Sequence, residues 1–305
     1  MKNKILSAHL ALFGANLIYG ANYLIAKGVM PDKIGPSAFV LIRIIGASLL
    51  FWIIRFFIRE KVEKKDLLRL LLCGLLGVAT NQMFFFNGLN LTSPIDASII
   101  ITAIPVMVLI FSMLILKEKI TTNKIAGLVI GGIGAVLLVS VGKDSGGTSS
   151  FLGNVFVLIN TTSYALYLVL VKPLMAKYHA LTVISWVFLF GLVFVIPIGA
   201  GDLLQTDFSA FDTSTYMAVI YVVVGTTFLA YLFNIYALNY VSPSVSSSYV
   251  YLQPAVSFIM VSVYAYLLNN DQYAQDITLV KVLSCILVIG GVYLISRPAK
   301  LSLAR

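Results

Sequence analysis

Apolar segments about as long as a bilayer is thick follow one another along almost the whole chain. They occupy residues 5–26, 35–58, 68–90, 94–116, 124–142, 151–172, 180–200, 215–238, 243–268 and 278–296. A helix needs about 20 predominantly apolar residues to cross the hydrocarbon core. In lipid, a spanning segment must also satisfy its own backbone hydrogen bonds, which restricts uninterrupted spans to helices. The pattern predicts an all-α integral membrane protein with ten transmembrane helices.

Composition excludes a water-soluble globule. Of the 305 residues 60% are hydrophobic and 11% are charged, and the mean hydropathy is +0.98, so there are too few charges to cover a globule of this size. The net charge of +9 could suggest nucleic acid, but the basic residues lie in short runs between apolar segments and form no continuous face. We expect no nucleic-acid partner. The expected partners are membrane lipid and a small-molecule substrate, and the sequence leaves a monomer and a homodimer open.

The first apolar segment has two interpretations. Lys2 and Lys4 precede an apolar run, as in a cleaved signal peptide. The run from Ile5 to Ala26 is nevertheless long enough to span, contains several Asn and Tyr residues, and lacks a convincing cleavage site. We interpret it as the first transmembrane helix.

One stretch of the chain occurs twice. Leu89 to Pro105 (LNLTSPIDASIIITAIP) and Leu238 to Pro254 (LNYVSPSVSSSYVYLQP) are 149 residues apart and identical at six of seventeen positions without a gap. Both copies keep two prolines at the same spacing, and because proline fixes φ and lacks a backbone donor, the coincidence favours duplication over chance. Tyr19 to Lys27 resembles Tyr164 to Lys172 in the same way.

A polar linker, KDSGGTSS from Lys143 to Ser150, divides the apolar segments into two groups of five. We expect a first repeat over residues 1–143, a linker over 144–150 and a second repeat over 151–305. Five is odd, so the second repeat must enter the membrane from the opposite side and the two repeats are inverted in topology. This arrangement is typical of secondary transporters, whose substrate site lies near mid-membrane between the repeats.

The loop charges predict the orientation. Most Lys and Arg residues, including the run from Arg55 to Arg69, lie at segment ends on the same side as the N-terminus, whereas most Asp residues lie on the other side. Cytoplasmic loops carry the excess of Lys and Arg. We therefore predict a multi-pass protein of the plasma (inner) membrane of a prokaryote, with both termini cytoplasmic.

Several short motifs now resemble a known family. They are IYGANYLIAK in the first segment, LIRIIGASLL around Arg43 in the second, the run FNGLNLTSP to ASIIITAIP, Glu118 in LKEKIT, and the glycine-rich fifth segment. With these the chain resembles the EamA family of the drug/metabolite transporter superfamily. It differs at Tyr19, where that family typically has Trp, and at Leu268 to Asp271, where an acidic residue is expected directly after the ninth helix. The resemblance implies a ten-helix carrier that moves small organic metabolites, often outward, without ATP.

Arg43 is the one charge well inside an apolar segment. An Arg in a spanning helix costs several kcal/mol on insertion scales, so it normally faces a cavity or a partner. Two interpretations stay open. Arg43 is either a structural residue that pairs with Asp96 or with helix-end carbonyls, or a cationic anchor for a carboxylate or phosphate of the substrate.

Polar and aromatic side chains also recur along one face of several segments. In the first segment Asn16, Tyr19 and Tyr23 share a face at helical spacing. Buried polar side chains need partners, and some will only bind neighbouring helices. As a set, they predict a polar, aromatic cavity. The predicted substrate-binding residues are Asn16, Tyr19, Tyr23, Arg43, Asn81, Phe85, Thr102, Asn160, Tyr164, Tyr231, Asn234 and Tyr251, with Gln82, Asn87, Ser247 and Gln253 as further polar groups.

The four prolines of the repeated stretch, Pro94, Pro105, Pro243 and Pro254, are predicted hinge or gating positions. Proline breaks helices locally, and one repeat could rock against the other at such breaks. Packing alone is the competing explanation.

Other classes of protein lack support. The sequence has no HExxH, no paired Asp and no His cluster for an enzyme or a metal site, and Cys73 and Cys285 lack metal-ligand spacing. It has no filter motif for a channel, and no Asp or Glu at mid-span for a carboxylate proton relay. We expect no enzymatic activity and no cofactor.

The predicted function is secondary, ATP-independent transport of small organic metabolites such as amino acids, with export by alternating access between the repeats. The alternative is a flippase for a lipid-linked sugar or another amphiphile, which should show a lateral opening.

Overall fold

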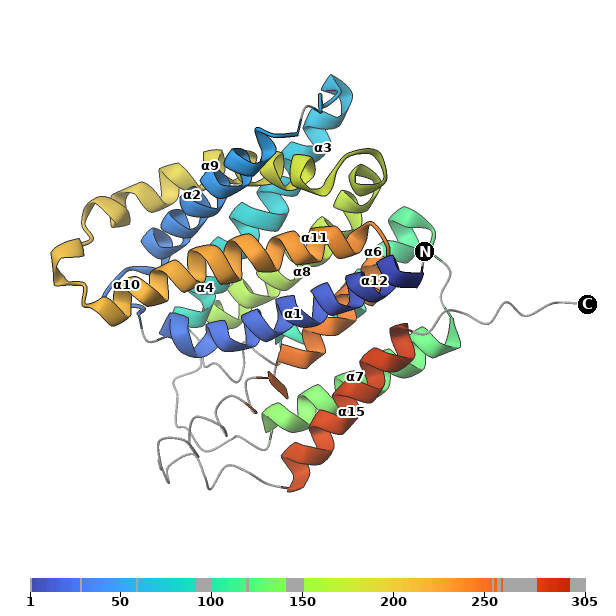
Figure 1. Ribbon diagram of the computed structural model, residues 1–305. Coiled ribbons are helices and arrows are strands. Elements are labelled where there is room, and N and C mark those ends of the chain that lie inside the picture. The colour runs from blue at the N-terminus through green and yellow to red at the C-terminus, as the bar shows by residue number, and fades with distance from the viewer. Residues whose placement is uncertain are drawn as a thin grey trace, which may run out of the picture.

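The computed structural model describes residues 2–27, 29–58, 60–91, 100–118, 121–140, 151–253, 255–256, 259 and 279–296. Every regular element of this part is helical (Figure 1). The elements are α1 (Lys2–Lys27), α2 (Pro36–Arg55), α3 (Lys64–Gly74), η1 (Leu75–Thr80), α4 (Asn81–Leu91), α6 (Ile104–Leu116), α7 (Thr122–Ser140), α8 (Phe151–Lys177), α9 (Ala180–Leu204), η2 (Phe208–Ala210), α10 (Thr213–Ile220), η3 (Tyr221–Leu229), α11 (Ala230–Leu238), α12 (Pro243–Ser248), η4 (Tyr249–Tyr251) and α15 (Leu279–Ser296).

Five helices of the described part are long and apolar enough to cross a membrane. They are Pro36–Arg55, Lys64–Leu91, Phe151–Lys177, Ala180–Leu204 and Thr213–Leu238. The second of these joins α3, η1 and α4, and the last joins α10, η3 and α11. Helices fall at all ten predicted segments, so the expected ten-helix, all-α fold is confirmed.

The helix ends differ from the hydropathy limits because a helix continues past the hydrocarbon layer. α8 runs on to Lys177 and α9 to Leu204, and α3 begins at Lys64. α2 ends earlier than expected, at Arg55. Hydropathy follows the lipid boundary, whereas hydrogen bonding sets the end of a helix.

The helices pair as two inverted repeats require. α2 lies antiparallel to α9, since Ser37 approaches Gly199 near one end of the pair and Phe51 bonds Ser185 near the other. α7 lies beside α15, and α1 beside α11 (Figure 1). α4 pairs with α8. This pair is equivalent to the α1–α11 pair, because α8 is the first helix of the second repeat and α4 belongs to the third helix of the first. An approximate two-fold axis therefore relates the repeats.

The α7–α15 pair is held by close backbone contact. A Cβ added to Gly291 would lie 2.5 Å from the Cα of Gly131, and one added to Gly127 would lie 2.6 Å from the Gly291 carbonyl oxygen. Only glycine fits at such a crossing. Apart from each other, α7 and α15 pack mainly against α12 and η4, and the pair lies at one edge of the molecule (Figure 1).

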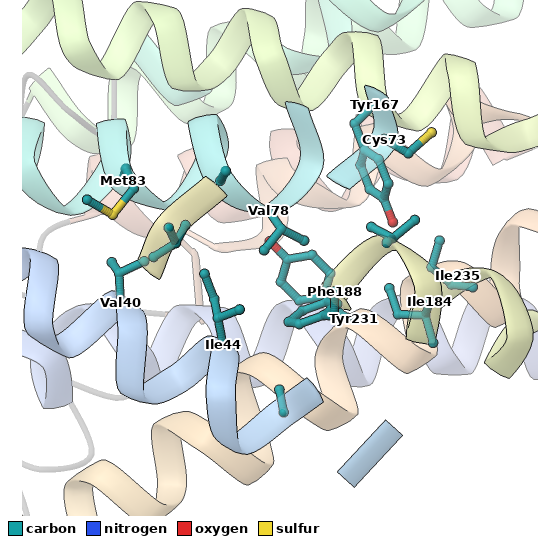
Figure 2. Close-up of a cluster of buried hydrophobic side chains, with 14 of the residues drawn as sticks. Val40, Ile44, Cys73, Val78, Met83, Tyr167, Ile184, Phe188, Tyr231 and Ile235 are labelled. Atoms are coloured by element: carbon teal, nitrogen blue, oxygen red, sulfur yellow. The ribbon is translucent and has the colours of Figure 1, made fainter. Parts of the chain in front are cut away.

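A buried apolar cluster joins the two repeats around α2, α9 and η1. Figure 2 shows side chains from both repeats meeting there, including Val40, Ile44, Cys73, Val78, Met83, Tyr167, Ile184, Phe188, Tyr231 and Ile235. Phe188 packs edge-on against Tyr231 with ring centroids 5.0 Å apart. This cluster fixes the helices that carry the polar residues described below.

Both copies of the repeated stretch interrupt their helix at the same place. A turn at Thr102 and Ala103 precedes α6, and the 3₁₀ turn η4 follows α12. In the sequence, each interruption lies just before the second proline of the stretch, Pro105 or Pro254, and proline disfavours a continuous helix through its own position. The sequence thus encodes the same break twice.

The prolines that can be placed lie at helix starts. Pro105 is in the first turn of α6 and Pro243 in the first turn of α12, where the missing N–H would have no partner in any case. Pro94 and Pro254 lie outside the described residues. A gating role for the four prolines stays a prediction.

Candidate functional site

A cavity of about 110 Å³ lies between the two repeats. Helices of both repeats contribute to its wall, and none of the described side chains that line it is an Asp or Glu. It is lined by Asn16, Tyr19, Asn22, Arg43, Asn81, Gln82, Phe85, Phe86, Ile101, Ile104, Asn160, Tyr164, Leu168, Thr226, Tyr231, Asn234, Ser246, Ser247, Val250 and Gln253. The wall is rich in amides, hydroxyls and aromatic rings and carries one cation.

The structure brings most of the predicted site residues to this wall: Asn16, Tyr19, Arg43, Asn81, Phe85, Asn160, Tyr164, Tyr231 and Asn234. Thr102 and Tyr251 instead line a separate, mostly apolar groove of about 530 Å³ beside α7. The side chain of Tyr23 lies outside the described residues.

Sequence reasoning left Asn22, Phe86, Thr226 and Ser246 out of the site. Asn22 follows Tyr19 by three positions, so helical spacing could have found it. Thr226 lies in the π-helical segment η3, which displaces side chains from α-helical spacing. Ser246 lies in a run of serines, SVSSS, whose members the sequence alone does not distinguish.

Arg43 is a buried cation at the cavity wall, with 3% of its surface exposed. Its Nε donates to Thr227 Oγ1 at 3.0 Å, and its guanidinium lies 4.4 Å from the ring centroid of Phe86. Nη1 is buried and has no hydrogen-bond partner among the residues described, and no described carboxylate pairs with the side chain. Asp96, the partner considered from the sequence, lies outside those residues.

Gln82 and Tyr231 meet where the two repeats face each other. They are 149 residues apart, the offset of the repeated stretch, and Gln82 Nε2 donates to Tyr231 Oη at 3.3 Å. The Tyr231 hydroxyl lies 3.1 Å from both the Gly77 carbonyl and Asn81 Oδ1, and can donate to one of them. Contact between equivalent positions places this pair near the two-fold axis, so the cavity lies at the centre of the molecule.

Amide side chains connect helices around the cavity. Asn16 Oδ1 accepts from Gln253 Nε2 at 2.9 Å, and Asn160 Nδ2 donates to the Asn81 carbonyl at 2.7 Å. Some other polar atoms at the wall do not connect helices in the described structure. Among the described atoms, Gln82 Oε1 and Ser246 Oγ are buried without a partner, as is Arg43 Nη1.

At one end of the bundle, ion pairs join the two repeats. Lys177 Nζ lies 2.6 Å from Asp66 Oδ2 and 2.7 Å from Glu63 Oε1. Tyr178 Oη donates to Asp66 at 2.6 Å, and the backbone N–H of His179 donates to Glu60 at 3.0 Å. Side-chain hydrogen bonds, the larger effect from Lys177 and the smaller from Lys65, hold the pKa of Glu63 below its ordinary value. We call these residues, 60–66 with 177–179, the Lys177 cluster.

Glu118 makes a second connection between the repeats at the same end. It pairs with Lys124, and its Oε2 accepts from Ser244 Oγ of α12 at 3.0 Å. Burial raises the pKa of Glu118, but bonds from Lys124, Ser242 and Ser244 outweigh burial and leave the pKa below its ordinary value. Glu118 is therefore ionised at neutral pH and holds the start of α12.

At the opposite end, the equivalent linkers leave a cleft. The Lys177 cluster joins the α2–α3 linker to the α8–α9 linker. When the two repeats are exchanged, the equivalent linkers are α9–α10 and α1–α2. They border an open space of about 540 Å³ lined by Asp32, Lys33, Asp202 and Asp207 among others. Within the described chain no carboxylate lies within 4.0 Å of Lys33 Nζ. We call this space the Lys33 cleft. In the described part of the chain, ion pairs thus bridge the linkers at one end of the bundle, whereas the equivalent linkers at the other end border a cleft.

Comparisons with known proteins agree with this architecture. The model of the EamA-like transporter family matches residues 6–140 and 151–297. An uncharacterized transporter of Archaeoglobus fulgidus is 26% identical over 87% of this chain and 90% of its own. The uncharacterized transporter YetK of Bacillus subtilis is 24% identical over 95% and 87%.

A probable terminal-alkyne amino-acid exporter of Streptantibioticus cattleyicolor is 24% identical over 67% of each chain. A crystal structure that is 18% identical superposes with a TM-score of 0.74 over 94% of this chain and 96% of that chain. The superposition shows that the fold is shared.

Proposed function

The chain belongs to the EamA-like transporter family, and we propose that it exports small organic metabolites such as amino acids through the cavity between its repeats. It is a multi-pass membrane transporter and not an enzyme. The observation that carries the proposal is the polar cavity around Gln82 and Tyr231, at the centre of two inverted repeats. Secondary transporters bind their substrates at this place.

The proposal includes alternating access, and the two ends of the bundle support it. Exchange of the repeats converts the Lys177 cluster into the Lys33 cleft, so equivalent linkers can close each end in turn. Lys33 and the Asp residues around its cleft provide the charges for a second ion-paired closure. In inverted-repeat carriers, the two access states arise when the repeats exchange conformations around a fixed site.

The direction and the orientation are supported separately. The relative from Streptantibioticus cattleyicolor is described as a probable exporter of an amino acid, which favours export of a related compound here. The excess of Lys and Arg beside the Lys177 cluster favours a cytoplasmic position for that end. A protease-sensitive tag at each terminus should be protected in right-side-out membrane vesicles and cleaved in inverted ones.

Transport in proteoliposomes tests the function. We expect the purified protein to release at least one amino acid or organic anion from a labelled panel, with and without a pH gradient. Tyr19→Leu, which alters the cavity wall, should slow release, while Tyr216→Leu, the same change at an exposed position on α10, should not. Absence of transport of every soluble compound by the folded protein would count against the proposal.

One observation favours a flippase as the second candidate. The groove lined by Thr102, Ala103 and Tyr251 lies directly beside Ile101 and Ile104, which line the cavity. Val129 and Ile133, on the α7 side of the groove, are about half exposed, so the groove opens toward lipid. Translocation of a fluorescent lipid in the same liposomes, without transport of soluble compounds, would support this alternative.

A further inference from the structure

Given the proposed function, we propose that the substrate is a compact carboxylate that also carries a hydrogen-bond donor, namely a small α-amino or α-hydroxy acid bound with its carboxylate on Arg43. The proposal names the substrate class of the cavity. It rests on charge, on unsatisfied polar atoms and on size.

The buried positive charge of Arg43 at the cavity wall favours an anionic ligand. Arg43 is 3% exposed and its Nη1 has no partner in the described part of the chain. A buried charge without a counter-charge is costly, and the described lining of the cavity offers no carboxylate. Thr227 and the ring of Phe86 hold the guanidinium from two sides. A planar carboxylate that accepts from Nη1 would supply the missing charge in the geometry that Arg favours.

The remaining unsatisfied atoms add a second requirement. Gln82 Oε1 can only accept a hydrogen bond, because Gln82 donates from Nε2 to Tyr231. Ser246 Oγ can donate or accept, and it is also without a partner in the described structure. A ligand that satisfies both Arg43 and Gln82 needs an acceptor group and a donor group. An α-ammonium or an α-hydroxyl beside a carboxylate provides that combination.

The size of the cavity limits the rest of the molecule. The cavity has a volume of about 110 Å³. An apolar cavity of about 150 Å³ accommodates benzene. Molecules of the size of alanine, serine or lactate suit this cavity, whereas an indole side chain exceeds it.

Ligand-induced thermal stabilisation of the detergent-purified protein tests the assignment independently of transport. The probes are L-alanine, L-lactate, propionate, L-alaninamide and L-tryptophan. We expect L-alanine to bind at least about tenfold more tightly than propionate, which lacks the donor, and than L-alaninamide, which lacks the carboxylate, because a hydrogen bond to a charged group contributes a factor of about 10 to 100. L-lactate, whose hydroxyl is a neutral donor, should bind more tightly than propionate by a smaller factor of about 5. L-tryptophan should not bind.

Variants identify the groups responsible. Arg43→Gln should abolish binding of both acids, and Arg43→Lys should retain part of it. Gln82→Leu should reduce the preference for L-alanine over propionate toward unity. Ser246→Ala should weaken binding. Ser112→Ala should not, because it removes a buried α6 hydroxyl that lies away from the cavity and has no partner among the residues described.

The outcomes separate this inference from the proposed function. If wild-type protein binds propionate, L-alaninamide or L-tryptophan as tightly as L-alanine, or if the folded Arg43→Gln variant binds L-alanine normally, the substrate class is wrong even if transport occurs. If L-alanine or L-lactate binds as expected but nothing in the panel crosses the membrane, the transport proposal fails and the ligand assignment stands. If Arg43→Gln does not fold, the comparison of probes on the wild type and on Arg43→Lys decides.

Discussion

At the scale of single residues, the structure gives Arg43 a setting that the sequence left open. Arg43 does not extend to the membrane surface; it is buried at the cavity wall, with Nε on Thr227 and Nη1 without a partner among the described residues. Thr227 in turn donates to the Val222 carbonyl at 2.7 Å, within the π-helical segment η3. The orientation of the cation therefore depends on a residue that hydropathy reads as an ordinary part of a span.

This contact yields a prediction for Thr227→Val. The change keeps the shape but leaves Arg43 Nε without its acceptor, so the free energy of unfolding should fall by about 1–3 kcal/mol and affinity for L-alanine should decline. Thr161→Val is the matched control, since Thr161 is also fully buried and its hydroxyl donates to the Val157 carbonyl of its own helix. Equilibrium unfolding in mixed micelles measures both. Equal losses in the two variants would show that Thr227 does not support Arg43.

At the scale of elements, the π-helical segments η1 and η3 lie at equivalent places in the third helix of each repeat. Each ends next to residues of the cavity wall, Asn81 and Gln82 after η1, and Tyr231 after η3. A π-helical turn is frequent at functional sites. It has no apolar signature of its own, which is why hydropathy predicted two regular spans.

The α7–α15 crossing gives a prediction at this scale. Gly291→Ala should destabilise the protein by about 1–3 kcal/mol, because its Cβ would lie 2.5 Å from backbone atoms of Gly131, which cannot move without separating the helices. Gly290→Ala is the control, since a Cβ at Gly290 meets nothing within 4 Å, and it should be neutral or slightly stabilising. Melting temperatures of the two purified variants test this, and a Gly291→Ala protein as stable as the control would contradict the close crossing.

At the scale of the whole molecule, the ion pairs of the described residues that join the two repeats lie at the end of the Lys177 cluster. Lys177→Met should weaken the link between the repeats and increase the population that is open at that end. Lys65→Met is the matched control, because Lys65 also pairs with Glu63 but joins two neighbouring residues of the first repeat. Labelling of a cysteine at Leu168, which lines the cavity, by an impermeant maleimide in inverted vesicles, with Cys73 and Cys285 replaced by Ala, should accelerate for Lys177→Met and not for Lys65→Met. Equal labelling rates for the two variants would show that the Lys177 cluster does not close this end of the bundle.

The same cluster has a defined pH dependence. The pKa of Glu63 is lowered in the folded protein, so its contribution is present above the ordinary glutamate pKa of about 4.3 and is lost as the pH falls through the lowered value. In the Leu168→Cys protein with Lys177 intact, the labelling rate should be divided by the rate of a free thiol at the same pH, which removes the pH dependence of the thiolate itself. This normalised rate should stay constant between about pH 5.5 and 8 and increase only in strong acid. A change near neutral pH would indicate that another group controls the closure.

The sequence alone determined the class of the protein. Apolar length predicts helices because lipid offers the backbone no other partner. The repeated stretch with its prolines predicts a duplication, and the odd number of five segments in each repeat makes the repeats inverted. Arg43, Asn16, Tyr164 and Tyr231 could be assigned to the cavity because polar groups inside apolar spans need a protein environment.

Tertiary structure decided what depends on contacts between distant segments. It turned Thr102 and Tyr251 toward a groove beside α7 and brought Ser246 and Thr226 to the cavity. It brought Gln82 and Tyr231 together near the two-fold axis, and left Arg43 Nη1 without a partner in the described structure. Hydropathy reports the preference of each residue for lipid, whereas the direction of a side chain and the closure of one end follow from how ten helices pack against one another.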